Sequence, residues 1–161
     1  MGIAALVTWL LTAAGGFVML GRWIAGGGLR RPRTSHLPPP VIFGHFALAA
    51  AGLIVWIAYL LAGEDALAWT ALVLLVPVAL LGFVMFARWL PVRRARATAT
   101  AAGYRGGQGG GQGGGTGGGT GGGTGAEPAE RRFPVAIVAG HGLLAVATVV
   151  LVLLTALGLG G

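Results

Sequence analysis

Four long stretches of this sequence contain no Asp, Glu, Lys or Arg, and they limit the possible folds more than any other feature. They run from Met1 to Gly21, from Leu37 to Gly63, from Ala66 to Ala87 and from Phe133 to Gly161. Each reaches the roughly 20 residues that an α-helix needs to cross a bilayer. Charged residues make up 9% of the chain, against about 25% in soluble domains. Because such long apolar runs exclude barrel strands, the sequence predicts an all-α, integral membrane four-helix bundle.

A nine-residue segment occurs twice in the chain. Residues 16–24 (GFVMLGRWI) and 82–90 (GFVMFARWL) are identical at six of nine positions. Each copy is followed by a proline-led apolar run with a Gly-His pair, so that residues 38–49 align on residues 134–145. We interpret the chain as two parallel-repeat helical hairpins. The first is 1–63, with spans of about 3–23 and 39–61, and the second is 64–161, with spans of about 67–89 and 134–157.

The basic residues are all arginines, and they fall into two loops that lie on the same side of the predicted bundle. These are Arg22, Arg30, Arg31 and Arg33 in the first loop, and Arg88, Arg93, Arg94, Arg96, Arg105, Arg131 and Arg132 in the second. The turn between spans two and three carries only Glu64 and Asp65. The positive-inside rule therefore predicts that both arginine-rich loops are cytoplasmic and that both termini are outside.

This distribution explains the net charge of +7 without a nucleic-acid partner, since no basic patch is interleaved with aromatic residues. The absence of lysine and the abundance of alanine and glycine indicate a GC-rich bacterial genome. We expect a multi-pass protein of the bacterial cytoplasmic membrane whose main contact is the lipid bilayer. The chain has no cysteine, which excludes disulfides and thiolate metal sites.

Two features of the second hairpin depart from a simple helix. Pro77 falls near the middle of the third span, where a missing backbone hydrogen bond is expected to kink the helix. We expect that span to end near Trp89, and the composition changes sharply from Pro91 to Arg132. Residues 106–125 are almost entirely glycine with some glutamine and threonine, and they predict a flexible cytoplasmic loop without a packed fold.

His45 and His141 are the residues most suited to chemistry. They occupy equivalent positions in the two hairpins, and His45 lies roughly 7 Å inside the predicted start of span two, counted from the prolines. An ionisable residue inside the membrane is a functional hypothesis by default. In the alternative interpretation, each imidazole forms a hydrogen bond with a carbonyl of a neighbouring helix and only holds the bundle together.

The specific hypothesis is a b-type haem with both histidines as axial ligands. Spans two and four lie on a diagonal of an up-and-down bundle, so that two equivalent imidazoles face each other across the core. In this layout the chain resembles small membrane-embedded b-type cytochromes with paired intramembrane histidines. The resemblance covers the bundle and the histidine pair; larger relatives carry a second pair that is absent here. It implies a one-electron carrier that meets a redox partner or a larger membrane complex.

The positions around the histidines fit a flat macrocycle. Small residues accompany each ring, with Ala49 and Gly52 on the His45 face and Ala145 on the His141 face. Thr148, also on the His141 face, offers a hydroxyl as a further hydrogen-bonding partner. Arg22 and Arg88 are equivalent across the repeat, and we expect them to pair with the two haem propionates at the cytoplasmic surface.

Two other functions remain open. Met19 and Met85 are also equivalent across the repeat, and with His45 and His141 they would form a soft site suited to Cu(I). The second alternative is a non-catalytic membrane subunit or assembly factor with structural histidines. Hydrolytic chemistry is poorly supported, because all four acidic residues lie outside the spans.

Overall fold

The computed structural model describes residues 1–30, 35–107, 129 and 133–159, apart from the side chains of residues 96 and 99–107. Four α-helices occupy nearly all of these residues, and none of them forms a strand. The helices are α1 (Gly2–Ala25), α2 (Pro39–Ala62), α3 (Asp65–Gly107) and α4 (Val135–Ala156). Each contains a span long and apolar enough to cross a membrane, which in α3 is Asp65–Ala95. The predicted all-α bundle of four membrane helices is confirmed.

Proline and glycine mark the ends of the helices. Pro38 and Pro134 precede α2 and α4 with extended backbone angles, as suits a residue that cannot donate a hydrogen bond. Gly63 ends α2 in the left-handed region at φ 72°, and its N–H donates to the Tyr59 carbonyl over 2.8 Å. Asp65 then begins α3. Its carboxylate stabilises the helix there, because the N-terminal end of the helix dipole is positive. This short turn places α3 antiparallel to α2.

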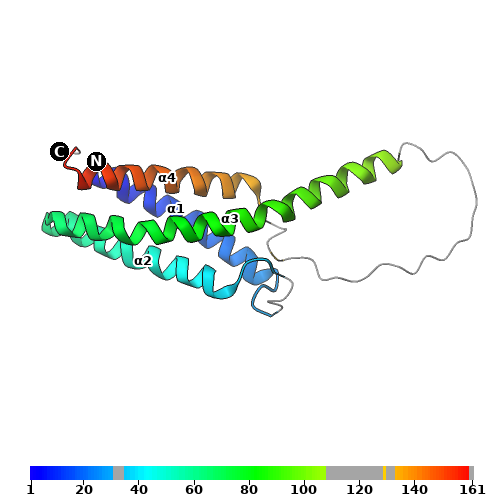
Figure 1. The fold of residues 1–161 in the computed structure, drawn as a ribbon, viewed down its shortest axis with the longest axis horizontal. Coiled ribbons are helices and arrows are strands. Elements are labelled where there is room, and N and C mark those ends of the chain that lie inside the picture. The colour runs from blue at the N-terminus through cyan, green and yellow to red at the C-terminus, as the bar shows by residue number, and fades with distance from the viewer. Residues whose placement is uncertain (31–34, 108–128, 130–132, 160–161) are drawn as a thin grey trace, which may run out of the picture.

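Helix α3 continues well beyond the predicted end of the third span. The third span is predicted to end near Trp89, but α3 includes both Pro77 and Pro91 and ends at Gly107. Four arginines of the second predicted loop therefore belong to this helix, namely Arg93, Arg94, Arg96 and Arg105. The residues after Pro91 are rich in arginine and alanine, which favour helix strongly enough to continue past one lost hydrogen bond. Figure 1 shows this part of α3 projecting from the bundle. Residues 106 and 107 of the predicted glycine-rich loop thus belong to α3, and residues 108–125 lie outside the described residues.

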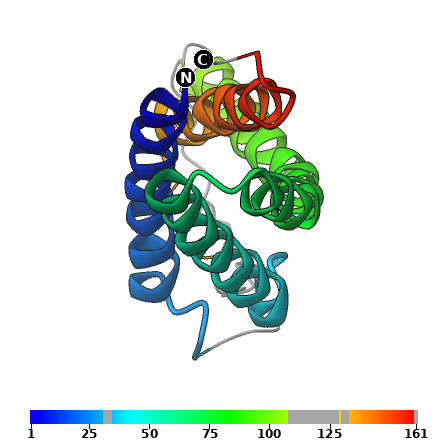
Figure 2. The same cartoon turned by 90° about the vertical axis from the view of Figure 1, so that its left-hand side faces the viewer.

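The closest helix neighbours are α2 with α3 and α1 with α4. The α1/α2 and α3/α4 contacts are much sparser, and the diagonal helices α2 and α4 make no close backbone contact within the described residues. Both chain ends lie at the same end of the bundle (Figure 1), and the view along the helices separates the two close pairs (Figure 2). The close pairs therefore differ from the hairpins that are continuous in sequence, since each pair combines one helix from each hairpin.

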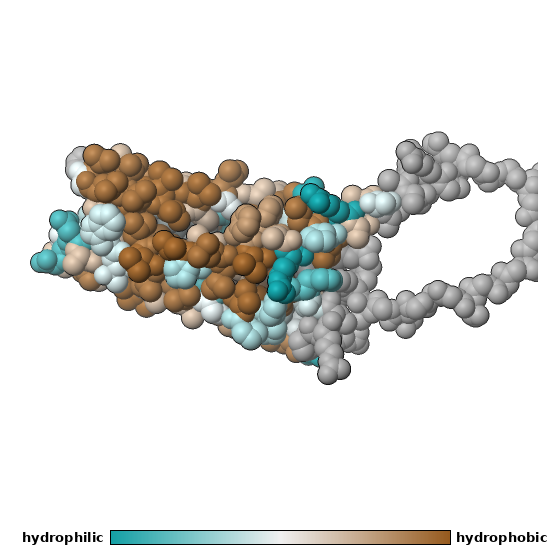
Figure 3. Space-filling view, in the orientation of Figure 1, coloured by the Kyte–Doolittle hydropathy of each residue, from teal (hydrophilic) through white to brown (hydrophobic). Residues whose placement is uncertain are grey.

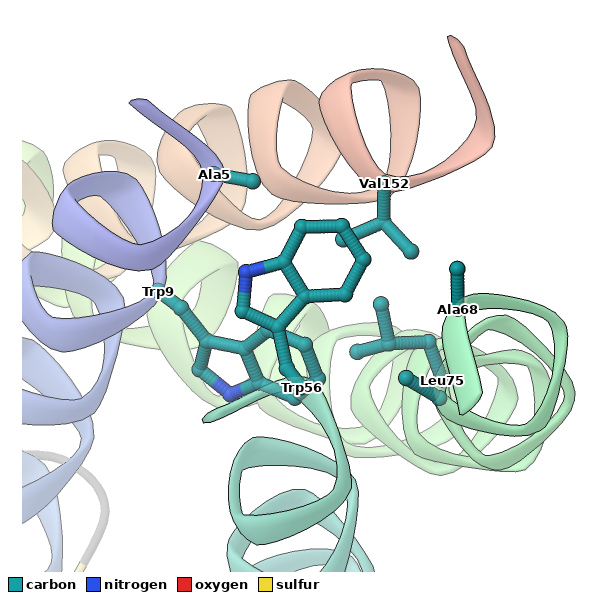
Figure 4. Packing of buried hydrophobic residues seen from close by; sticks show 7 residues of the cluster. Ala5, Trp9, Trp56, Ala68, Leu75 and Val152 are labelled. Carbon is teal, nitrogen blue, oxygen red and sulfur yellow. The ribbon is translucent and has the colours of Figure 1, made fainter. Parts of the chain in front are cut away.

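Two hydrophobic clusters lie at opposite ends of the bundle. The outer cluster, near the chain ends, contains Ala5, Trp9, Trp56, Ala68, Ala71, Leu75 and Val152. Figure 4 shows the Trp56 indole in the middle of this group, and its Nε1 donates to the Gly2 carbonyl over 3.3 Å. The inner cluster contains Trp23, Leu37 and Ala129, and the Trp23 Nε1 donates to the Ser35 hydroxyl over 3.1 Å.

Most apolar side chains of the spans face outward. Between 11% and 17% of each span is buried within the protein, and the exposed residues include many large hydrophobic ones. Figure 3 shows hydrophobic colour along the middle of the visible face and hydrophilic colour towards its two ends. A surface of this kind suits contact with lipid, and the chain is a multi-pass membrane protein by its fold.

Candidate functional site

The structure brings His45 and His141 together between the two hydrophobic clusters. His45 extends from α2 and His141 from α4, and their ring centroids are 6.4 Å apart with an interplanar angle of 49°. Both side chains are half-buried. Since α2 and α4 make no close backbone contact, the two imidazoles meet across the diagonal of the bundle. This is the relation that the equivalent sequence positions predicted.

Each imidazole forms a hydrogen bond with a backbone carbonyl of the neighbouring helix. His45 Nδ1 lies 2.9 Å from the Val78 oxygen on α3, and His141 Nδ1 lies 2.9 Å from the Thr12 oxygen on α1. A carbonyl oxygen only accepts, so Nδ1 must donate its proton in both cases. In a neutral imidazole the other nitrogen, Nε2, then keeps a free lone pair. Both rings are therefore in the tautomer that ligates a metal through Nε2.

Each imidazole also lies against a glycine on the helix that supplies its carbonyl. A Cβ atom added at Gly16 would be 3.3 Å from His141 Cε1, and one added at Gly82 would be 3.3 Å from His45 Cε1. We call each combination of ring, carbonyl and glycine an imidazole socket. The α1/α4 socket consists of His141, the Thr12 carbonyl and Gly16, and the α2/α3 socket consists of His45, the Val78 carbonyl and Gly82.

The hydrogen bonds of the Thr148 hydroxyl go to groups other than the His141 ring. Its hydroxyl oxygen is 3.0 Å from the hydroxyl oxygen of Thr8 and 2.8 Å from the Leu144 carbonyl. The Nδ1 atom of His141 bonds to Thr12 on the other helix. The hydroxyl predicted to support the histidine instead links α4 to α1, within the same close helix pair.

The space predicted at Gly52 is filled. A Cβ at Gly52 would come within 3.1 Å of Trp9 Cη2 and Cζ2, so the indole of α1 lies directly over this glycine of α2. Sequence comparison of the hairpins gave no sign of this, because the facing of an apolar side chain depends on the rotation of its helix. Trp9 therefore limits the space that a flat group could occupy beside Gly52. Ala49 lies between His45 and Gly52 in the sequence.

The two predicted arginines lie beyond the histidines toward the inner end. Arg22 and Arg88 are both exposed, six residues after Gly16 and Gly82, which is about 9 Å along each helix. Arg88 Nη1 donates to the His36 carbonyl over 3.3 Å. Met85 packs against the inner cluster, and Met19 is half-buried. The hydrogen bond of Arg88 is thus directed to the His36 carbonyl, and Met85 is directed to the inner cluster.

The alternative interpretation predicted a carbonyl of a neighbouring helix as the partner of each imidazole, and the structure shows this bond. Reasoning from sequence missed which two carbonyls take part and that a glycine lies beside each ring. Gly16 and Gly82 stand first in the repeated nine-residue segment, and each carbonyl belongs to the residue four positions earlier. The sequence signal that could have identified the glycines is their occurrence at the same position in both copies of the segment. Neither a protein-family model nor a curated protein nor a solved structure matches this chain.

Proposed function

We propose that this protein is a one-electron carrier that holds a single b-type haem between His45 and His141 in the membrane. The observation that carries the proposal is the pair of half-buried imidazoles whose Nδ1 atoms each lie 2.9 Å from a backbone carbonyl. In a neutral ring this leaves Nε2 as the nitrogen that can ligate a metal. Haem iron takes nitrogen ligands of this kind at its two axial positions.

The separation of the rings supports the proposal. Two metal–nitrogen bonds of about 2 Å, with about 1 Å from each nitrogen to its ring centre, separate two axial imidazoles by about 6 Å between centroids. The observed separation is 6.4 Å. The rings belong to diagonal helices, which is where helix bundles hold cofactors between facing side chains.

The ligand set favours a macrocycle over a bare metal ion. No group of three or more His, Cys, Asp or Glu side chains gathers anywhere in the described residues. Two imidazoles alone leave most coordination positions of a metal such as iron unfilled, and a porphyrin supplies four further nitrogens in one plane. That plane would lie between the α1/α4 pair and the α2/α3 pair, where contacts between helices are sparsest.

The remaining parts of the proposal follow from charge and symmetry. The chain is a parallel repeat of two hairpins in a bacterial cytoplasmic membrane, with both termini outside and the arginine-rich loops inside. Arg22 and Arg88 pair with the haem propionates on the cytoplasmic side. A haem held by His45 and His141 would supply one-electron chemistry between a reduced and an oxidised redox partner, one of which a larger membrane complex would provide.

One observation favours a second function. Each Nδ1 bond ties two helices of a close pair together, His45 joining α2 to α3 and His141 joining α4 to α1. In a non-catalytic subunit or assembly factor, these bonds between helices would be the whole role of the two histidines. A Cu(I) site with Met19 and Met85 is the third candidate, and it requires both thioethers to reach the imidazoles.

An absorption spectrum tests these functions. The protein is purified in detergent from cells supplied with a haem precursor, and spectra are taken before and after reduction with dithionite. We expect a sharp reduced-minus-oxidised α-band that is lost in His45→Ala and in His141→Ala. The matched control is His36→Ala, because His36 is an exposed loop residue and the substitution keeps the backbone carbonyl that accepts from Arg88.

A folded protein without a haem spectrum would contradict the proposal. Helix content and a single symmetric peak in gel filtration establish that the protein is folded. Metal analysis of the same sample then decides between the two alternatives: bound copper lost with either histidine identifies the Cu(I) site, and a protein without metal is the structural subunit.

A further inference from the structure

We infer that Gly16 and Gly82 are positioning residues that control the direction in which the imidazole Nε2 atoms point. Gly16 acts on His141, and Gly82 acts on His45. The consequence for haem rests on the proposed function, whereas the effect of each glycine on its imidazole does not. Glycine has no side chain that could bind a metal, so each glycine acts only through the ring that lies against it.

Each glycine first makes its carbonyl acceptor accessible. In an α-helix the Cα–Cβ bond tilts toward the N-terminus, so a side chain covers the turn that precedes its own Cα. The Thr12 carbonyl belongs to the turn before Gly16, and the Val78 carbonyl belongs to the turn before Gly82. Without a side chain at the glycine, a donor from another helix reaches the second lone pair of the carbonyl.

Each glycine also limits the rotation of the ring. The nearest ring atom to a Cβ at Gly16 or Gly82 is Cε1, at 3.3 Å, and the next is Nδ1, at 3.8 Å. Cε1 lies between Nδ1 and Nε2 in the imidazole. A methyl group at the glycine would therefore press on the edge of the ring that carries Nε2. With Nδ1 held by the carbonyl, the ring can respond only by turning Nε2 or by lengthening the hydrogen bond.

Other glycines of the chain provide matched comparisons. A Cβ at Gly15 would meet His141 Cβ and Nδ1 at 3.6 Å, which is ordinary van der Waals contact with the same histidine. A Cβ at Gly21, later in α1, would meet nothing within 4 Å. Gly15→Ala and Gly21→Ala thus make the same chemical change on the same helix without pressing on the ring edge.

The first experiment uses the protein without haem. Long-range ¹H–¹⁵N correlation spectra of ¹⁵N-histidine-labelled protein in micelles report the tautomer and the environment of each imidazole nitrogen. We expect Gly16→Ala to shift the Nδ1 and Nε2 resonances of His141 and to leave those of His45 near their original positions. Gly82→Ala is expected to do the reverse, and Gly15→Ala and Gly21→Ala to change neither ring substantially.

The second experiment uses the haem-loaded protein. The angle between two axial imidazole planes governs the anisotropy of a low-spin ferric haem, so electron paramagnetic resonance reads the ligand orientation. We expect Gly16→Ala and Gly82→Ala to shift the largest g value and the midpoint potential at unchanged haem content. Gly15→Ala and Gly21→Ala should retain the wild-type signal. A role confined to helix packing would alter stability without this change in the spectrum.

The two experiments separate the inference from the proposed function. If the protein binds no haem, the apo spectra still decide whether each glycine controls its own histidine. If haem binds and Gly16→Ala gives the same imidazole resonances and g values as Gly15→Ala, the inference is overturned while the proposed function stands. Alanine favours helix more than glycine does, so the variants are expected to fold. Gly16→Ser and Gly82→Ser add the same Cβ atom and provide a second pair of variants. Shifted imidazole resonances and g values in this pair would support the inference, and unchanged ones would overturn it.

Discussion

The indole of Trp9 lies over Gly52 so closely that a Cβ at this glycine would come within 3.1 Å of two indole carbons. The contact joins α1 to α2, two helices that otherwise touch only sparsely. It belongs to the outer cluster, which is the largest group of buried hydrophobic residues among those described. This cluster therefore holds the two close helix pairs together at the end opposite the inner cluster.

Gly52→Ala is expected to destabilise the bundle by about 1–3 kcal/mol, because an extra methyl group in a well-packed core forces neighbouring side chains out of place. The free energy of unfolding in mixed detergent micelles, followed by tryptophan fluorescence, measures the loss. Gly44→Ala is the control on the same helix, since a Cβ there meets nothing within 4 Å. Equal stability of the two variants would contradict the close packing of Trp9 on Gly52.

Trp56→Ala is expected to cost about 3–5 kcal/mol, because it removes a large, fully buried side chain. The Gly2 carbonyl also loses the indole N–H that it accepts. Thermal unfolding followed by circular dichroism provides the measurement. The control Trp69→Ala removes the same type of side chain from a position that is 44% exposed. If it lowered the stability as much as Trp56→Ala does, burial in the outer cluster would not explain the effect.

Thr148→Val is expected to weaken the contact between α1 and α4 by about 0.6 kcal/mol, the average for a hydrogen bond between membrane helices. The variant loses the link to Thr8 and keeps a similar shape. Under the proposed function the haem spectrum stays unchanged, because His141 bonds to Thr12 instead. Thr70→Val is the control, since Thr70 bonds only to the Ala66 carbonyl of its own helix among the described contacts.

Arg22→Gln and Arg88→Gln test the pairing with haem propionates. Removing a nearby positive charge favours the more positive ferric state, so each variant should lower the midpoint potential, on the order of tens of millivolts. Redox titration followed at the α-band measures the change. Arg93→Gln is the control, since Arg93 lies over the Trp89 ring at 5.6 Å, further along α3. A shift in Arg93→Gln as large as in the other two would remove the case for specific pairing.

The predicted membrane orientation can be tested with single cysteines, because the chain has none of its own. A membrane-impermeant maleimide is expected to label Glu64→Cys in intact cells and Arg30→Cys only after the membrane is opened. The reason is that arginine-rich loops stay in the cytoplasm. The opposite pattern of labelling would invert the orientation and place the proposed propionate pairing on the outer side.

The histidine pair was predictable from sequence, whereas most of its surroundings were not. The repeat placed His45 and His141 at equal depth, and the up-and-down order of the helices placed them on a diagonal. The hydrogen bonds to Thr12 and Val78 could not be foreseen, because any carbonyl of a neighbouring helix satisfies a buried imidazole equally well. The bonding of Thr148 could not be foreseen either, and its hydroxyl bonds to Thr8 and to the Leu144 carbonyl.

The sequence by itself determined four membrane helices and kept every arginine outside the four apolar stretches, because backbone groups in lipid must bond within a helix and charges must remain near water. Only the tertiary structure decided that α1 lies along α4 and α2 along α3, and that Gly16 and Gly82 face the imidazoles. A helix that is apolar all around carries little polarity signal for which side faces its neighbours. Close packing of particular shapes, such as indole on glycine and imidazole on glycine, sets that rotation instead.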